Sequence, residues 1–157
     1  MSTSDLYILN KKSTTHFRGF RNGWGSGPVC WDYLAKKYGV PSSMFDMNPV
    51  WALASGGRLA HHERVAMMMT FDAAYVPMGK LQDAAESCER FGAESEDGAR
   101  ANHWTAFGAA LRDAAKQRHN RFARGICLSC TSVSDNWGYG SDWPDKAWSI
   151  YDEDTQE

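Results

Sequence analysis

The chain has 157 residues, a length that suits one domain with a buried core. Hydrophobic residues make up 43% of the sequence and aromatic residues 13%, and this composition excludes a disordered chain. The formal net charge of -2 gives no reason to expect direct binding of nucleic acid. We expect a single globular domain over residues 1–157, with an acidic tail from about residue 152.

Short patterned segments predict the elements of the N-terminal half. Residues 6–9 (LYIL) predict a strand, and residues 14–20 predict a second strand or an irregular loop. A helix is expected to begin at Pro28, where proline fits the first helical position, and to end at Gly39. Another helix is expected within residues 48–56, after the Asn-Pro pair that opens this range.

The C-terminal half adds three helical patterns and two strands. Residues 59–76 predict the longest helix, and residues 81–91 and 104–115 carry clean apolar stripes. Residues 125–133 alternate like a strand, and residues 146–151 are expected to form a last strand. Together the elements predict an α+β fold, a single compact domain in which about five helices pack on a small, mainly antiparallel β-sheet.

No targeting or membrane segment is predicted. The N-terminus lacks a basic region followed by an apolar run, and no apolar stretch approaches the ~20 residues that a membrane helix needs. We therefore expect a cytoplasmic protein that does not bind membranes. The four cysteines, at positions 30, 88, 127 and 130, are then expected to be free thiols.

The segment of residues 14–28, TTHFRGFRNGWGSGP, is the first candidate site, as a partner- or anion-binding surface. Its arginines offer planar donor forks, its glycines allow close approach of the backbone, and the following helix directs N–H groups toward it. It matches neither GxxxxGK[ST] nor GxGxxG, so no nucleotide motif is met. The candidate residues are His16, Arg18, Arg21, Trp24 and Gly25.

The alternative for this segment is a structural loop. Residues 11–21 hold four Lys and Arg residues and no acid, whereas residues 135–157 hold seven acids and one lysine. In this alternative the arginines pair with the acidic C-terminal part, and Trp24 fills the core.

Polar residues after the predicted strand at 125–133 form a secondary candidate site. Ser132, Asp135 and Trp137 lie in the sequence TSVSDNW, but no GxSxG motif accompanies them, and a simple turn explains the same residues. The pair Cys127 and Cys130 would point to opposite faces of a strand, so we predict no shared metal there.

The histidine-rich helix start is the last pattern that could indicate chemistry. His61, His62 and Glu63 do not form an HExxH motif, and we predict that they make a solvated first helical turn. No metal site and no cofactor is predicted anywhere in the chain.

Residues 6–39 (LYILNKKSTTHFRGFRNGWGSGPVCWDYLAKKYG) and residues 131–137 (TSVSDNW) resemble small proteins encoded by bacteriophages and prophages. The similarity extends loosely over most of the chain. That group has no established activity, so the resemblance implies a context and assigns no catalytic residue. Phage accessory proteins of this size often bind and block a host protein or a defence complex, as anti-CRISPR proteins do. The resemblance therefore implies such a partner, in the host cytoplasm.

Two functions remain for the chain. The first is a binder without catalysis that inhibits or modulates a host protein or defence complex. It is favoured by the lack of catalytic motifs, the opposed charge blocks and the many Trp and Tyr residues, which anchor interfaces. The second is a small enzyme, or a protein that binds a nucleotide or phosphate ligand through His16, Arg18 and Arg21. We expect the first.

Overall fold

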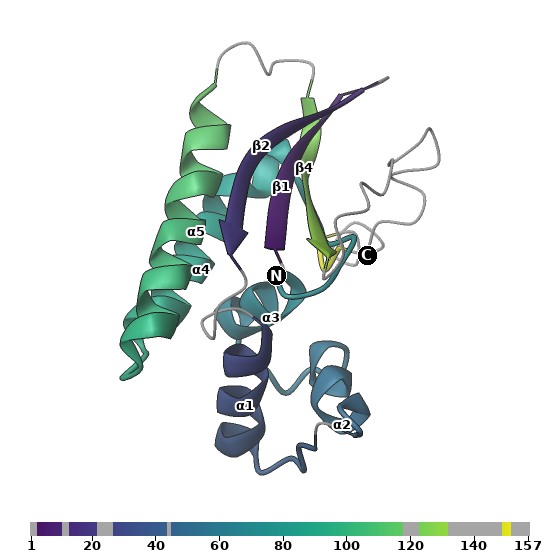
Figure 1. Ribbon diagram of the computed structural model, residues 1–157, viewed down its shortest axis with the longest axis vertical. Coiled ribbons are helices and arrows are strands. Elements are labelled where there is room, and N and C mark those ends of the chain that lie inside the picture. The colour runs from purple at the N-terminus through teal and green to yellow at the C-terminus, as the bar shows by residue number, and fades with distance from the viewer. Residues whose placement is uncertain are drawn as a thin grey trace.

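Four strands form one antiparallel β-sheet in the order β2-β1-β4-β3 (Figure 1). The structure is a computed structural model and describes residues 3–10, 13–21, 27–43, 45–117, 123–131 and 149–151. The strands are β1 (Thr3–Asn10), β2 (Thr14–Arg21), β3 (Tyr75–Pro77) and β4 (Ala123–Thr131). The two inner strands are thus the first and the last strands of the described chain.

Strand β1 shows how the sequence gives the sheet two different faces. Leu6 and Ile8 alternate with Asp5 and Tyr7, so each pair points to one side. Leu6 pairs with Leu128 of β4 and lies in the main core, where it is fully buried. The opposite face carries the polar pair, and this alternation fixes the register of the strand.

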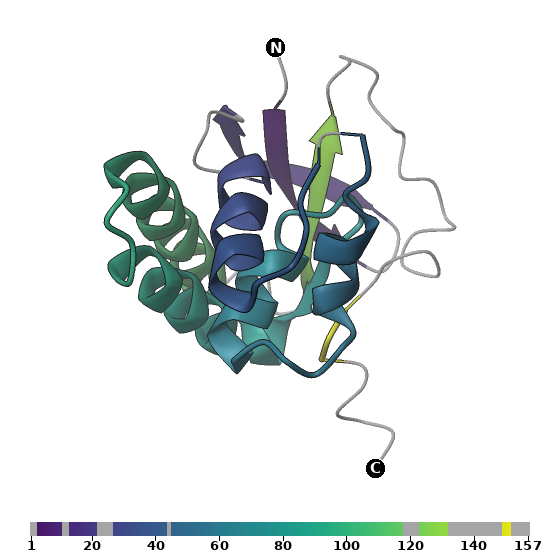
Figure 2. The same cartoon turned by 90° about the horizontal axis from the view of Figure 1, so that it is seen from below.

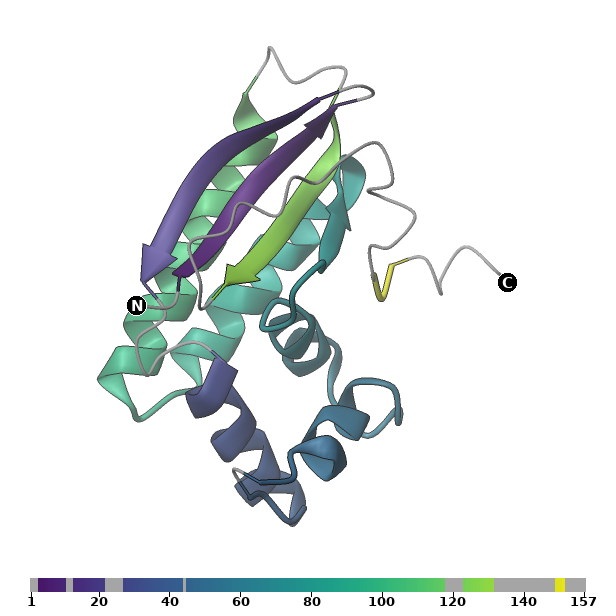
Figure 3. The same ribbon diagram turned by 45° about the vertical axis from the view of Figure 1, so that its right-hand side comes forward.

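Two long helices cover the core side of the sheet. They are α4 (Leu81–Ala93) and α5 (Gly98–Lys116), which lie side by side behind the strands in Figure 3. Asp97 caps α5, because its Oδ1 atom accepts hydrogen bonds from the backbone N–H groups of Ala99 (2.8 Å) and Arg100 (3.3 Å). The cap begins a helix directly after the short turn from α4.

The core lies between this helical hairpin and the sheet. Its largest buried side chains include Phe91 of α4 and Trp104, Phe107 and Leu111 of α5. The rings of Phe91 and Trp104 meet edge to face with centroids 5.4 Å apart, a favoured aromatic geometry. The apolar stripes of the sequence thus become the contact between the two helices and the sheet.

The remaining helices lie at one end of the sheet (Figures 1 and 2). They are α1 (Gly27–Tyr38), α2 (Asn48–Trp51) with the 3-10 turn η1 (Ala52–Ala54), and α3 (His61–Met68); a second 3-10 turn, η2 (Met78–Lys80), precedes α4. Gly39 ends α1 with a φ of +65°, a left-handed conformation that favours glycine. We call α1, α2 and the turn between them the α1–α2 lobe.

The fold class predicted from the sequence is confirmed. Five α-helices and one antiparallel four-stranded sheet are present among the described residues, in one compact α+β domain. The segment 14–20, left open between strand and loop, is part of β2. Cys127 and Cys130 do point to opposite faces of β4, because Cys127 packs with Leu9 and Cys130 contacts Ser4.

The long helix predicted for residues 59–76 is wrong. Helix α3 stops at Met68, and the chain turns through Ala73, which has a φ of +66°, into β3. The Ala73 N–H donates to the Leu128 carbonyl of β4 (3.0 Å), so the sheet takes over the backbone that the sequence pattern assigns to the helix. Of the strand expected at residues 146–151, the described residues 149–151 form a turn instead.

Candidate functional site

The predicted site residues divide into two groups. His16, Arg18 and Arg21 lie in β2 at one edge of the sheet. The others lie outside the described residues: Trp24, Gly25, Ser132, Asp135 and Trp137. The candidate site can therefore be built at β2 alone.

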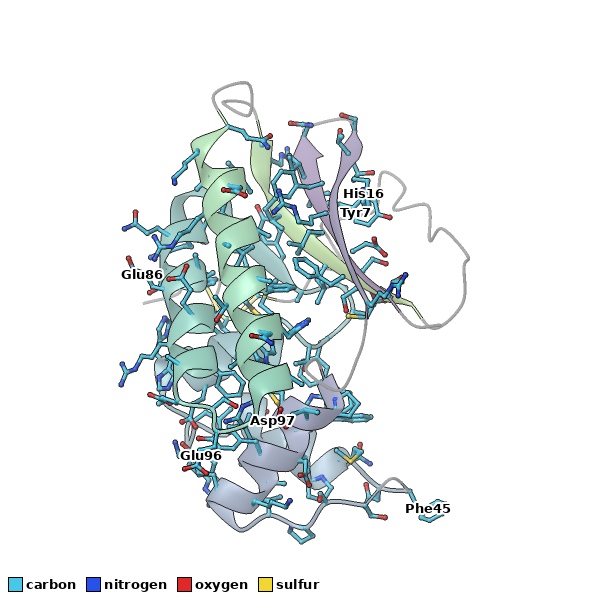
Figure 4. All side chains as sticks on the ribbon, turned by 60° about the vertical axis from the view of Figure 1, so that its left-hand side comes forward. Tyr7, His16, Phe45, Glu86, Glu96 and Asp97 are labelled. Atoms are coloured by element: carbon cyan, nitrogen blue, oxygen red, sulfur yellow. The ribbon has the colours of Figure 1, made fainter. Side chains whose placement is uncertain are left out.

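His16 belongs to a small polar cluster on the sheet face away from the helical hairpin. Its Nε2 atom lies 2.9 Å from Oδ1 of Asp5, and its ring meets the Tyr7 ring edge to face with centroids 5.4 Å apart. Figure 4 shows Tyr7 and His16 side by side on this face. Burial, together with the charge of Asp5, raises the pKa of the Tyr7 hydroxyl, so Tyr7 is neutral at neutral pH.

Gly19 makes room for this cluster. A Cβ atom at position 19 would lie 2.7 Å from Asp5 Oδ1 and 3.7 Å from His16 Nε2. The glycine therefore permits the close approach of the carboxylate and the imidazole across two strands.

Arg18 lies on the other side of β2. It pairs with Leu6, whose side chain faces the core, and its Nη1 atom lies 3.4 Å from Oδ2 of Asp113 on α5. The two side chains are 43% and 51% exposed, so this ion pair is weak. The side chains of Arg18 and His16 therefore lie on opposite sides of the sheet. Arg21 is exposed and is the last residue of β2.

A second surface, which the sequence pattern did not single out, lies on the α1–α2 lobe. Phe45 is 93% exposed and Trp51 is 39% exposed, and they are the large exposed hydrophobic side chains of the described chain. Figure 4 shows Phe45 projecting away from the body of the molecule. Trp51 packs against Trp31 of α1, and we call Phe45, Trp51 and Trp31 together the aromatic surface.

A tight turn presents Phe45. The Asp46 N–H donates to the Ser43 carbonyl (2.9 Å), and the Phe45 N–H donates to Ser43 Oγ (3.2 Å). The Asn48 N–H then donates to Asp46 Oδ1 (3.1 Å), which joins the turn to the start of α2. Short polar side chains therefore hold the backbone in place while the phenyl ring stays in solvent.

Thr70 and Phe71, which follow α3, hold the indole rings of Trp31 and Trp51 in place. Trp31 Nε1–H donates to Thr70 Oγ1 (2.8 Å), and the Trp31 ring lies 5.6 Å from that of Trp51, edge to face. Both rings are also 6.3 Å from the ring of Phe71. These contacts fix the two indoles, so this part of the aromatic surface is formed before any partner arrives.

A hollow of about 330 Å³ adjoins the aromatic surface. It is lined by Pro28, Trp31, Asp32, Ser42, Ser43 and Met47. Its lining is mainly apolar, and Phe45 lies in the sequence between the lining residues Ser43 and Met47. Aromatic side chains and well-packed pockets are the features that dominate the binding energy of protein interfaces.

Glu63 is a buried carboxylate that could carry chemistry. Its burial shows that the prediction of a solvated first helical turn at this position is wrong. Its side chain is fully buried, and it accepts hydrogen bonds from Lys37 Nζ (2.9 Å), the Tyr38 hydroxyl and the Ala60 N–H (3.1 Å). Burial acts to raise the pKa of Glu63, but the hydrogen bonds from Tyr38, Lys37 and Ala60 outweigh it and leave the pKa below its ordinary value. The neighbouring His62 is also buried and bonds Glu94 at 2.7 Å.

Arg100 lines a second hollow, of about 430 Å³, between α1 and the turn from α4 to α5. Its guanidinium carbon lies 3.6 Å from the centroid of the Tyr33 ring, and its Nε–H donates to Ser95 Oγ (2.7 Å). Four carboxylates, Asp32, Glu94, Glu96 and Asp97, also line this hollow and oppose the entry of an anion. The cation–π contact gives Arg100 a structural role.

Reactive cysteine chemistry has little support in the described residues. Burial raises the pKa of the Cys30 and Cys88 thiols strongly, and raises that of Cys130 to about 11. No group of three or more metal-ligating side chains converges within the described ranges. The described helices also include none with the length and apolar character that spanning a bilayer requires.

Comparison with known proteins assigns no relative to this chain: no family model, no curated protein and no solved structure matches it.

Proposed function

We propose that this protein acts without catalysis, by binding a partner protein through the aromatic surface of the α1–α2 lobe. The 93% exposure of Phe45 is the observation that carries this proposal. Single exposed hydrophobic side chains are common, but here an exposed phenyl ring, a partly exposed indole and a mainly apolar hollow occur together on one lobe, and such a combination is typical of a protein-binding surface. Trp51 and the adjoining hollow extend the surface beyond a single side chain.

The partner that we propose is a host protein or a component of a bacterial defence complex, which the protein inhibits or modulates. This part of the proposal is supported by the resemblance to phage and prophage proteins. Aromatic residues at the centre of an interface dominate its binding energy, so a small domain with one such surface can block a larger protein.

The alternative, an enzyme or a phosphate-binding protein, draws support from the Asp5–His16 pair. A histidine that is oriented by a carboxylate is a common general base. However, the arginine that would bind an anion beside it, Arg18, faces α5. We therefore favour the binder.

The experiment is capture of a partner from a bacterial lysate with the wild-type protein and with Phe45→Ala. Because Phe45 is exposed, its truncation should leave the melting temperature unchanged while it weakens the captured complex by about 2 kcal/mol, or about thirtyfold in Kd. The control, Arg90→Ala, removes a side chain that is 68% exposed on α4 and should bind like the wild type.

The proposal fails if no protein survives washing while a nucleotide or a phosphorylated metabolite raises the melting temperature of the wild type. That result would favour the small-ligand alternative instead.

A further inference from the structure

We infer that the outer edge of β2 is a second binding site, which accepts an acidic, extended segment of a partner protein as an added strand. This inference deepens the proposed function by naming the chemistry of a further contact. Its experiment uses purified protein and a peptide, so it can fail while the capture experiment succeeds.

The two edges of the sheet differ sharply. The β3 edge has three residues and ends in Pro77, and both features prevent the addition of a further strand. The β2 edge has eight residues and contains neither proline nor lysine. A long edge without proline presents unpaired N–H and C=O groups to which another strand can add, and the cations and the bulge of β2 restrict which strands can do so.

The outer edge of β2 has no partner within the described residues. Its strand pairing is to β1 alone, and no backbone hydrogen bond joins it to a loop or a helix of the described chain. Most of its side chains are exposed. The residues from Arg18 to Arg21 pair continuously with Leu6 to Thr3, so four residues form a regular template on one side of the bulge at Phe17.

The positive charge of β2 favours a partner segment with acidic side chains. The strand carries Arg18, Arg21 and His16 and no acid, and the described acids paired with it are Asp5 of β1 and Asp113 of α5. Arg21 has no ion pair among the described residues. Two copies of this strand would bring like charges together, whereas an acidic strand would meet opposite charge. Backbone hydrogen bonds would supply affinity, and the arginines would supply selectivity.

The experiment uses an acidic eight-residue probe, acetyl-VEVEVEVE-amide, and its charge-reversed counterpart acetyl-VKVKVKVK-amide. Titration into isotopically labelled full-length protein should move the amide resonances of Thr14–Arg21 most and should slow amide exchange in that strand. The lysine peptide should leave these resonances in place. Binding should weaken as ionic strength rises.

Charge variants supply the matched control. Arg18→Glu with Arg21→Glu should weaken binding of the acidic peptide by about tenfold or more, because two attractive pairs become repulsive. Lys36→Glu with Lys80→Glu makes the same change of net charge on α1 and η2 and should change the affinity by less than about twofold. If the first pair impairs folding, Arg18→Gln with Arg21→Gln tests the same point with a milder change.

Several results would overturn the inference. One is resonance changes that centre outside β2, and another is equal binding of the two peptides. A third is full affinity in the folded β2 variant. A fourth is slow exchange of the outward-facing β2 amides in the free protein, which would mean that the edge is already occupied.

Discussion

Glu63 illustrates at the scale of one residue how this core tolerates a charge. A fully buried carboxylate is costly unless its oxygens are bonded, and here a lysine, a tyrosine hydroxyl and a backbone N–H bond it. Two of these donors come from the end of α1, so the carboxylate links α1 to α3. We regard this network as structural, since neither described hollow is lined by Glu63.

Glu63→Gln should therefore lower the free energy of unfolding by about 2 kcal/mol at neutral pH, because a neutral amide replaces the charged acceptor. The folded pKa of Glu63 lies below its ordinary value of about 4.3, so its stabilisation is complete above that pH and is lost as the pH falls through the folded pKa. Urea unfolding of both proteins at pH 7 and pH 3 measures this. A difference that does not shrink at pH 3 would contradict it.

His103 is a partly buried group whose charged form is destabilised, in contrast to the charged form of Glu63. Aromatic neighbours surround it, with the Trp104 and Phe107 ring centroids 5.1 and 5.7 Å away, and burial lowers the pKa of His103 to about 4. The unfolded chain takes up this proton near pH 6.5 and the folded protein does not, so stability should fall as the pH drops from about 6.5 to 4.

Proton NMR of the imidazole resonances checks this value directly. The His103 signal should titrate near pH 4, and His103→Leu should remove the matching part of the pH dependence of stability. A midpoint near 6.5 would show that the imidazole is solvated.

At the scale of elements, helices α4 and α5 are held together by close packing and by an ion pair. Gly108 of α5 permits it, because a Cβ there would lie 2.6 Å from Glu89 Cγ and 2.9 Å from the Ala85 carbonyl oxygen. Arg112 also joins the helices, with Nε 2.7 Å and Nη2 2.9 Å from the two carboxylate oxygens of Glu89. Close approach and a bidentate pair together set the spacing of the two helices.

Gly108→Ala should destabilise the protein by about 1–3 kcal/mol, because backbone of α4 must move to admit the methyl group. Gly98→Ala is the control, since a Cβ there meets nothing within 4 Å and should stabilise the start of α5 by about 0.5 kcal/mol. Thermal unfolding measures both. Equal effects of the two substitutions would show that Gly108 does not lie tightly against Ala85 and Glu89 of α4.

Some of these elements could be predicted from the sequence and others could not, and the difference has a physical reason. The stripes of α4 and α5 and the alternation of β4 depend on local periodicity, so they are readable from the chain. The end of α3 is not, because it depends on a distant group: Trp31 Nε1–H donates to Thr70 Oγ1, which itself donates to the Met67 carbonyl three residues earlier (2.6 Å). Hydrogen bonds across the fold override the helical pattern of residues 69–76.

The candidate sites follow the same division. Arg18 and Arg21 could be identified from the sequence as exposed cations, yet their position on an edge strand depends on the order of the strands. Phe45 could not be identified at all, because an apolar residue in a short turn is more often buried. The burial of Glu63 was missed because its partners Lys37 and Tyr38 lie on another helix.

At the scale of the whole molecule, the two proposed contacts occupy different parts of the structure. The aromatic surface lies on the α1–α2 lobe at one end of the sheet, and β2 forms one long edge of it (Figure 1). A partner that engages both would meet an apolar anchor at one point and a basic strand at another. Two modest contacts on one compact domain can together give a high affinity.

The most direct test of the central claim is photo-cross-linking in bacterial cells, with benzoylphenylalanine incorporated in place of Phe45. The aromatic surface predicts a discrete cross-linked partner from position 45. It predicts none from position 80, where Lys80 is exposed on η2. The absence of any product at position 45, or the same products from both positions, would contradict the claim that this surface binds a specific protein.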